Sequence, residues 1–249
     1  MVIKDGAKMS KSLGNIVDPD DAVASFGADT VRVFMLFAAP VQKDLDWSDE
    51  GIEGAFRFLS RLWRLIYDRF EGIKNAAVPP DPASVSEAGK ALRVKVHKTI
   101  KKVTGDLEKF QFNTAIAAVM ELLNDTSRFD PQGEGDASAL RESIEAMVRL
   151  LYPIAPHVTE ELWAELGYGE TLVDEPWPAW DKGLVAGAAI TVVVQINGKV
   201  RAQLSLESDV TEEGMKEAAF ADEKIQGHLD GKEPRKVLVV PKKLVNIVM

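Results

Sequence analysis

Residues 48–70 read SDEGIEGAFRFLSRLWRLIYDRF, and this stretch decides the fold of the longest part of the chain. Its large apolar residues recur every three or four positions, which is the spacing of one face of an α-helix. They are Ile52, Phe56, Leu59, Leu62, Trp63, Ile66 and Phe70. Ser48 or Asp49 precedes the pattern and is suited to cap the first turn. The sequence therefore predicts a long amphipathic helix that buries one face against other helices.

Further helical patterns follow the first helix. They span about residues 86–104, 113–127 and 137–151, and a shorter one follows Pro156. Helices that are joined by short connections pack as antiparallel neighbours. We therefore predict an antiparallel helical bundle over residues 48–170.

The hydrophobic period changes to two after Gly187. Apolar residues alternate on both sides of Asn197-Gly198, a two-residue turn that is typical of a β-hairpin. A helical stretch and two more strands complete the chain, over residues 211–229, 236–240 and 244–248. The predicted fold is mainly α: the bundle, a linker over residues 171–187, and a small α+β domain over residues 188–249.

The composition excludes several classes of protein. With 249 residues and 46% hydrophobic content, the chain can bury one or two ordinary cores. It has no cysteine, which excludes disulfides and thiolate metal sites, and we expect no metal site. No apolar run reaches the length of a membrane span, so we expect a cytoplasmic protein. The net charge of −9 argues against indiscriminate binding to nucleic acid.

The first 47 residues are predicted to form a loop followed by two short helices. The loop contains Lys8-Met9-Ser10-Lys11-Ser12, with Gly6 and Gly14 on either side to supply backbone freedom. One helical turn directs Lys8 and Lys11 to the same side. Two ammonium groups so placed can stabilise the negative charge that develops on a leaving pyrophosphate. The loop is therefore a candidate site for a nucleotide.

This loop, continued by Leu13-Gly14-Asn15, resembles the mobile ATP-binding loop of class I aminoacyl-tRNA synthetases. The segment from Asp18 to Arg32 resembles the segment after that loop in the leucine, isoleucine, valine and methionine enzymes. Trp47 to Leu59 resembles the leucyl enzymes specifically. The most discriminating segments, Val194 to Arg201 and Val239 to Val248, resemble the carboxy terminus of bacterial leucyl-tRNA synthetases.

The resemblance implies a two-step reaction, in which leucine and ATP form leucyl-adenylate and the leucyl group passes to tRNA-Leu. Lys8 and Lys11 then have the catalytic role, Met9, Ser10 and Ser12 help to bind ATP, and Mg²⁺ enters with ATP as substrate. The bundle corresponds to an anticodon-binding-type domain and residues 1–47 to the end of the catalytic domain. The resemblance also implies a monomer.

The family's His-x-Gly-His nucleotide signature is absent from these residues, because the histidines are His97, His157 and His228. We therefore expect most of such an enzyme to lie upstream of Met1, together with the sites for leucine and adenosine. These 249 residues alone are expected to be inactive.

Two groups of basic residues are candidates for RNA contact. In the bundle they are Arg93, Lys98 and Lys101; a solvated helix face is an equally good explanation there. In the closing domain they are Lys199, Arg201, Arg235, Lys236, Lys242 and Lys243. We favour the closing domain, since only a local basic surface of an acidic chain attracts RNA. The resemblance implies the same, because that domain is thought to hold the elbow and long arm of leucine tRNA.

Two alternatives remain open at this point. The chain is a free-standing RNA-binding or interaction module derived from a synthetase, or it is the same region of a valyl or isoleucyl enzyme. The lysine loop argues against the first, because a module without catalysis has no physical need for a phosphate-binding loop.

Overall fold

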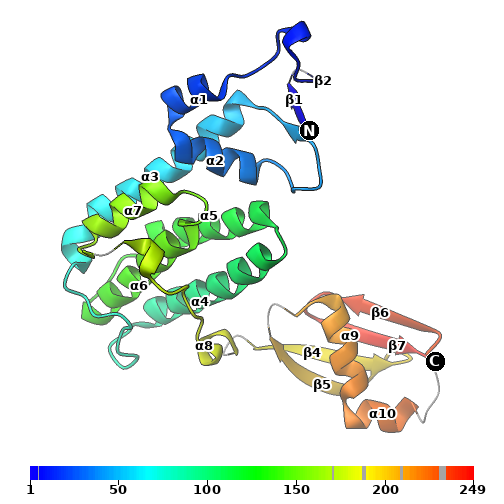
Figure 1. Cartoon of the computed structure of the whole chain (residues 1–249). Helices are drawn as coiled ribbons and strands as arrows, with labels where there is room; N and C mark the ends of the chain where they lie inside the picture. Colours follow the sequence, from blue (N-terminus) through cyan, green and yellow to red (C-terminus); the bar gives the residue numbers. More distant parts are fainter. Residues whose placement is uncertain (5, 170, 187–188, 208–209, 230–233) are drawn as a thin grey trace. The chain divides into compact units, whose positions relative to one another are not determined.

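The computed structural model describes the chain except residues 5, 170, 187–188, 208–209 and 230–233. The described residues form two compact units, Met1–Trp180 and Asp181–Met249 (Figure 1). The first unit is mainly helical, and the second combines one sheet with helices, as the predicted fold class requires. The division falls inside the predicted linker. A further division at residue 47 stays a prediction, because residues 1–47 belong to the same compact unit as the bundle.

The amino-terminal segment forms a small three-stranded sheet. Its strands are β1 (Val2–Lys4), β2 (Ala7–Lys8) and β3 (Leu45–Asp46). The middle strand, β1, pairs antiparallel with β2 and parallel with β3. The helices α1 (Pro19–Phe26) and α2 (Ala28–Phe37) lie between β2 and β3 in the chain. The sequence predicted the helices but not the sheet, because strands of two or three residues are too short to show alternation.

The bundle consists of α3 (Asp49–Ile73), α4 (Glu87–Glu108), α5 (Phe112–Arg128), α6 (Glu134–Leu151) and α7 (Pro156–Glu165). α4 packs against α5 and α6, and α6 also contacts α3 and α7. The predicted cap of α3 is confirmed at Ser48, whose hydroxyl accepts a hydrogen bond from the Gly51 amide at 3.1 Å. A serine thus supplies a partner for an amide that the helix itself leaves without one.

α4 and α6 are longer than predicted. α4 continues through Gly105, and α6 begins three residues earlier, with Gly135 in its first turn. Gly135 is required by packing, since a Cβ atom there would lie 2.3 Å from the Ser84 carbonyl oxygen. A close approach between segments, and not a break in the helix, explains this glycine.

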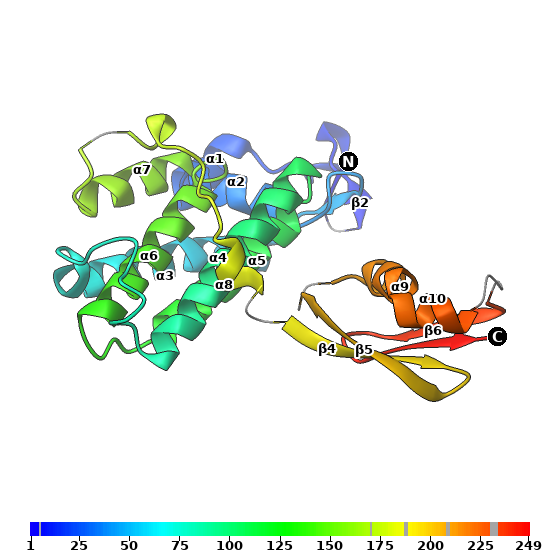
Figure 2. The same ribbon diagram turned by 90° about the horizontal axis from the view of Figure 1, so that it is seen from below.

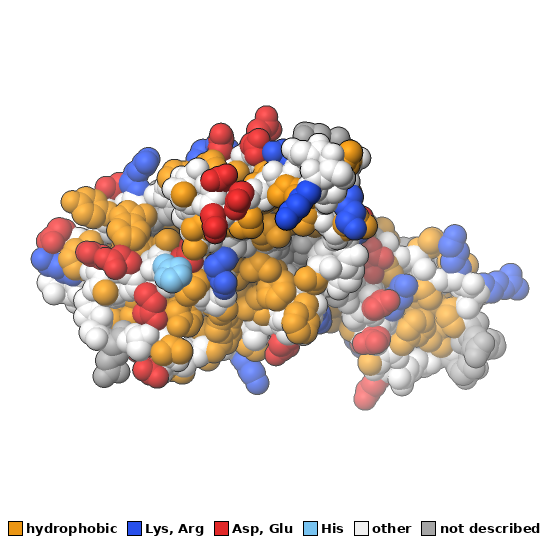
Figure 3. Space-filling view, turned by 45° about the horizontal axis from the view of Figure 1, so that its top comes forward, with side chains coloured by type: hydrophobic (Ala, Val, Ile, Leu, Met, Phe, Trp, Pro, Cys, Tyr) orange, Lys and Arg blue, Asp and Glu red, His pale blue; other side chains and the backbone are white. Residues whose placement is uncertain are grey.

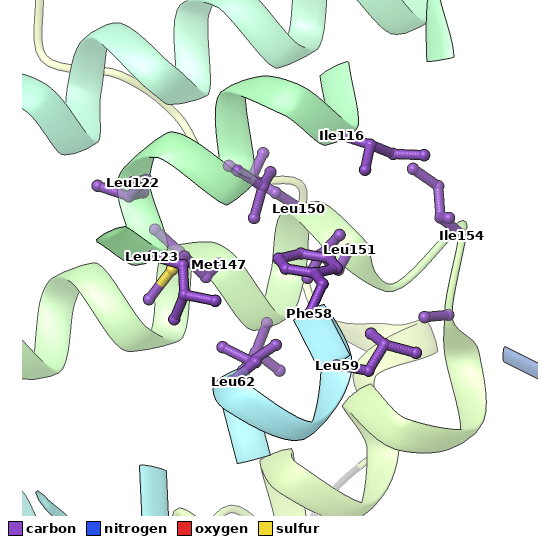
Figure 4. Packing of buried hydrophobic residues seen from close by; sticks show 14 of the residues in the cluster. Phe58, Leu59, Leu62, Ile116, Leu122, Leu123, Met147, Leu150, Leu151 and Ile154 are labelled. Atoms are coloured by element: carbon purple, nitrogen blue, oxygen red, sulfur yellow. The ribbon is translucent and has the colours of Figure 1, made fainter. Parts of the chain in front are cut away.

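The core of the bundle is a single apolar cluster. Figure 4 shows Phe58, Leu59 and Leu62 of α3 facing Leu123 of α5 and Leu151 of α6. All five side chains are buried.

The predicted stripe is only partly the buried face of α3: Ile52, Leu59, Leu62 and Ile66 are buried, but Phe56 and Trp63 are exposed. The helical period placed these two at the margin of the stripe, where the neighbouring described helices leave much of their surface uncovered. Burial of the remaining apolar face contributes to the stability of the unit.

The segment after α7 returns along the bundle. It contains a 3₁₀ turn, η2 (Leu172–Asp174). The indole nitrogen of Trp177 donates a hydrogen bond to the Thr104 hydroxyl of α4 at 2.9 Å, and Trp180 packs against the apolar core. These tryptophans fasten the end of the first unit to the bundle.

The second unit is a four-stranded sheet with helices on one face (Figure 2). Its elements are α8 (Lys182–Ala186), β4 (Ala189–Ile196), β5 (Lys199–Glu207), α9 (Glu212–Ala221), α10 (Glu223–Leu229), β6 (Lys236–Val240) and β7 (Leu244–Val248). The strand order is β5-β4-β7-β6, with β4 parallel to β7 and the other pairs antiparallel. Met215 and Ala219 of α9 and Ile225 of α10 complete the core over the sheet.

The predicted hairpin turn at Asn197-Gly198 is confirmed. Both residues have positive φ, +50° and +76°, which suits the turn that joins two twisted strands. The predicted limits of the last two strands also agree with the structure. In the part of the chain that the structure describes, no helix is sufficiently long and apolar to cross a membrane.

Candidate functional site

The five residues from Lys8 to Ser12 form a tight turn beside the amino-terminal sheet. Lys8 ends β2, and Lys11 begins a 3₁₀ turn, η1 (Lys11–Leu13). The Ser10 hydroxyl caps this turn by accepting a hydrogen bond from the Leu13 amide at 3.3 Å, and it lies 3.1 Å from the Ser12 hydroxyl. Gly14 closes the turn at φ +64°. The two serines therefore shape the backbone of the loop.

The two lysines of the loop are accessible. Lys8 and Lys11 are both exposed, and neither ammonium forms an ion pair with another described residue. Met9 is half-buried, and its amide donates to the Val2 carbonyl at 3.1 Å. The loop thus combines a fixed backbone with flexible cationic side chains, which suits the binding of a polyphosphate.

Asn15 is a residue of this site that the sequence did not single out for a role. Its side-chain amide forms hydrogen bonds with the backbone of Lys4, Ala7, Lys8 and Ser10. Its position directly after Gly14, at the exit of the turn, was the available signal.

α2 connects the loop-bearing segment to the bundle. The Asp29 carboxylate accepts a hydrogen bond from the Val158 amide at 2.6 Å, in the first turn of α7. The Arg32 guanidinium donates to the carbonyls of Ile154 at 2.8 Å and Pro153 at 3.1 Å. α2 is therefore in direct contact with the start of α7, although more than 120 residues separate the bonded groups.

The basic residues of α4 are largely matched by acids. Ion pairs join Lys90 to Glu87, Lys95 to Glu121 and Asp125, and Lys102 to Asp106. Lys98 and Lys101 are half-buried on the same helix. On the face of the helical unit that Figure 3 shows, Lys and Arg side chains are also scattered among Asp and Glu.

Arg93 differs from the expected RNA contact. It is buried, and its Nε and Nη2 donate to the two carboxylate oxygens of Glu142 at 2.7 and 3.2 Å. His97 Nε2 lies 3.3 Å from the same carboxylate. Burial raises the pKa of Glu142, but hydrogen bonds from His97 and Arg93 outweigh it and hold this pKa below its usual value. Arg93 joins α4 to α6 inside the bundle and is not presented to a phosphate.

The six basic candidates of the second unit lie at two opposite ends of its sheet. Lys199 pairs with Ile196, and Lys236 pairs with Val248, so these lysines mark the same end on the outer strands β5 and β6. Three strand spacings, about 14 Å in all, separate these strands. Lys242 and Lys243 lie in the turn between β6 and β7, at the other end.

The face of the second unit that the helices leave open is also defined by the register. Arg201 falls at the register shift between β4 and β5, which is a β-bulge. On β6, Val237 and Val239 pack into the core, so Lys236, Leu238 and Val240 lie on the opposite face. All six basic candidates of this unit are exposed.

Two known families match the chain, one over its first residues and the other over a range that begins in α4 and extends into the second unit. The family described as tRNA synthetases class I (I, L, M and V) matches residues 1–48. The anticodon-binding domain of tRNA ligase matches residues 89–215, which is more than half of the chain.

Several curated relatives match the whole chain. A leucine–tRNA ligase of Geotalea uraniireducens (strain Rf4) is 52% identical over 251 residues, and one of Syntrophobacter fumaroxidans (strain DSM 10017 / MPOB) is 48% identical over 253 residues. In each case the alignment covers 100% of this chain and 30% of the relative. The chain therefore spans less than a third of the length of these relatives.

A solved structure has the same fold. It is the ternary LeuRS–tRNA–LeuAMS complex of Agrobacterium radiobacter K84 agnB2, which matches with a TM-score of 0.73 at 33% identity. The match covers 100% of this chain and 32% of that one.

Proposed function

Because the chain belongs to the leucyl-tRNA synthetases and matches their carboxy-terminal region, we propose that it is part of an enzyme that activates leucine with ATP and transfers it to tRNA-Leu. The 249 residues contribute one loop to the first step and an RNA-contacting unit to the second. They are inactive alone, because the pockets for leucine and adenosine lie elsewhere in the enzyme. The enzyme works as a monomer in the cytoplasm.

The proposed role of the loop in leucine activation rests on its exposed lysines. Lys11 begins a capped turn, and Lys8 ends a strand, so both stems start from fixed backbone. Their ammonium groups contact the β- and γ-phosphates of ATP, which arrives with Mg²⁺ as substrate. Pyrophosphate gains negative charge as it leaves, and the lysines stabilise that charge in the transition state. Met9, Ser10 and Ser12 support the nucleotide from the same turn.

Replacement of Lys11 tests the loop. In the whole synthetase, Lys11→Ala should lower leucine-dependent pyrophosphate exchange by about 10²–10⁴-fold, which is the range for a lost transition-state contact. Lys8→Ala should have a smaller effect. Lys43→Ala is the matched control, because Lys43 is an exposed lysine of the same unit outside the loop. An unchanged exchange rate for Lys11→Ala would contradict the assignment.

The proposal that the second unit contacts tRNA rests on the different places of its acidic and basic residues. On its helices α9 and α10, and at Asp222 between them, five acids outnumber the two lysines; the acids are Glu212, Glu213, Glu217, Asp222 and Glu223, and the lysines are Lys216 and Lys224. The six exposed basic candidates lie instead on the strands and turns. The sheet side therefore attracts phosphates, while the helical side repels them. Rigidly held charges of this kind suit the shape of a folded RNA.

A free-standing RNA-binding module is not favoured as an alternative. Residues 1–48 match a class I synthetase family, and the leucine–tRNA ligase relatives match the whole chain, loop included. The valyl and isoleucyl alternatives are not favoured either, since the curated relatives named above, which match over 100% of the chain, are leucine enzymes.

A further inference from the structure

We propose that Asn15 is a positioning residue of the synthetase: its side-chain amide holds the lysine loop in the shape that stabilises the departing pyrophosphate. This inference rests on the proposed function of the loop. Asn15 does not itself touch ATP. It acts through the backbone from which Lys8 and Lys11 extend.

The geometry of the amide supports this role. Asn15 Oδ1 accepts a hydrogen bond from the Ser10 amide at 2.9 Å. On the other side, Asn15 Nδ2 lies 3.2 Å from the Lys4 carbonyl and 3.4 Å from the carbonyls of Ala7 and Lys8. One half-buried side chain therefore joins the end of β1, the strand β2 and the start of the 3₁₀ turn.

The loop needs such a connection because its own structure is minimal. β2 has two residues, and β1 pairs with it through only two residue pairs, Ile3 with Lys8 and Lys4 with Ala7. The 3₁₀ turn has three residues, and none of them is buried. Short elements without a core are easily deformed, since few contacts oppose their opening. The hydrogen bonds of Asn15 span this weak region.

The chemistry of an amide makes the role specific. An asparagine side chain offers an acceptor and two donors at once, and the two sides of this site require both. Aspartate has nearly the same shape and keeps an acceptor for the Ser10 amide. It has no donor for the three carbonyls, and its negative charge faces their oxygens. Asn15→Asp therefore separates hydrogen bonding from simple filling of space.

The expected consequence is a defect in the chemical step. A shift of about 1 Å in a catalytic group can cost about 100-fold in rate. We expect Asn15→Ala and Asn15→Asp to lower kcat of pyrophosphate exchange by about 10- to 100-fold, within that limit. The KM for leucine should not change, because the leucine pocket lies outside this loop. The thermal midpoint of the protein should not change either, because Asn15 is outside both apolar cores.

The experiment compares four variants of the whole synthetase: Asn15→Ala, Asn15→Asp, Lys11→Ala and Asn75→Ala. Asn75 is an exposed asparagine of the same unit and serves as the matched control. Pyrophosphate exchange gives kcat and KM, and hydrogen exchange of the peptide covering residues 3–15 reports on the shape of the loop. Faster hydrogen exchange in this peptide, with a lower kcat for both Asn15 variants, is the expected result.

Two outcomes overturn the inference, and they can be told apart. If Asn15→Asp keeps the normal kcat while Lys11→Ala loses activity, the loop functions as proposed but Asn15 only fills space. If Lys11→Ala also keeps the normal rate, the function proposed for the loop fails, and the role of Asn15 fails with it.

Discussion

α4 and the strands of the second unit both carry runs of basic residues in the sequence, but the structure surrounds these runs differently. On α4, acids from the same helix or from α5 form ion pairs with Lys90, Lys95 and Lys102. In the second unit, most acids of the described residues lie on or beside α9 and α10, and the six basic candidates lie on the strands and turns. A run of lysines in a sequence is therefore not yet a basic surface. Whether the lysines form a basic surface depends on where the nearest acids lie.

Arg93 is neutralised by an acid more fully than the three paired lysines of α4. In the sequence it belongs to a basic run, but in the structure it forms a buried pair with Glu142 that joins α4 to α6. If the basic residues of α4 stabilise the packing of the bundle, loss of the ion pair between Arg93 and Glu142 should lower stability and leave RNA binding unchanged. Glu142→Gln leaves the Arg93 charge buried without its partner, and the free energy of unfolding should fall by about 3–5 kcal/mol. Chemical denaturation of the 249-residue chain measures it.

The same pair predicts a dependence on pH. The pKa of Glu142 is lower in the folded protein than the ordinary value of 4.5 for a glutamate. The ionised carboxylate therefore stabilises the fold above about pH 4.5, and this contribution is lost as pH falls through the folded pKa. Glu142→Gln should unfold with a shallower dependence on acid pH than the original chain. Equal slopes would show that the pair does not contribute in this range.

The fold was predictable where local patterns are long. The predicted limits of residues 236–240 and 244–248 match β6 and β7, because alternation, a turn and a hairpin partner all agree there. The helices of the bundle were predicted to within a few residues by their apolar stripes. The sheet of β1, β2 and β3 was not, because its strands have only two or three residues and the pairing of β1 with β3 joins residues some forty positions apart.

The candidate site was predictable to a similar extent. The loop residues were identified by a motif that is contiguous in the sequence. The role of Asn15 and the pairing of Arg93 with Glu142 depend on contacts between segments, which periodicity does not report. The family resemblance supplied the identity of the chain, and the structure supplied which lysines are matched by acids.

Reversal of charge tests directly whether the basic residues of the sheet, and not those of α4, bind RNA. Its effect on tRNA affinity should be the next largest. We expect reversal of the basic positions at the two ends of the sheet to weaken tRNA binding about 10- to 100-fold at low salt. Each phosphate contact that is lost should lower the slope of log K against log salt by about 0.7–0.9. One variant changes Lys199, Arg201, Arg235 and Lys236 to Glu, and a second changes Lys242 and Lys243. Binding of leucine tRNA to the whole synthetase at several salt concentrations gives both quantities.

The matched control reverses Lys90, Lys95 and Lys102 on α4. Because acids already neutralise these lysines, the control should keep both the affinity and the salt slope. If instead the control loses tRNA and the sheet variants keep it, the bundle is the RNA-binding surface. Lys98 and Lys101, which lie on the same helix, then become the leading candidates. A difference between the two sheet variants would show which end of the sheet contacts the RNA.

The smallest expected effect concerns the ion pairs of α4 themselves. Lys95 bridges to Glu121 at 3.1 Å and to Asp125 at 3.6 Å, both on α5, and all three side chains are partly or largely exposed. Exposed pairs contribute little, because water and salt screen them. Lys95→Gln should therefore lower the free energy of unfolding by less than about 1 kcal/mol, and the loss should disappear in high salt. The double variant with Glu121→Gln measures the coupling between the two charges. A loss as large as that of Glu142→Gln would mean that the exposed pairs of α4 also hold the bundle together, and burial would no longer distinguish Arg93 from its neighbours.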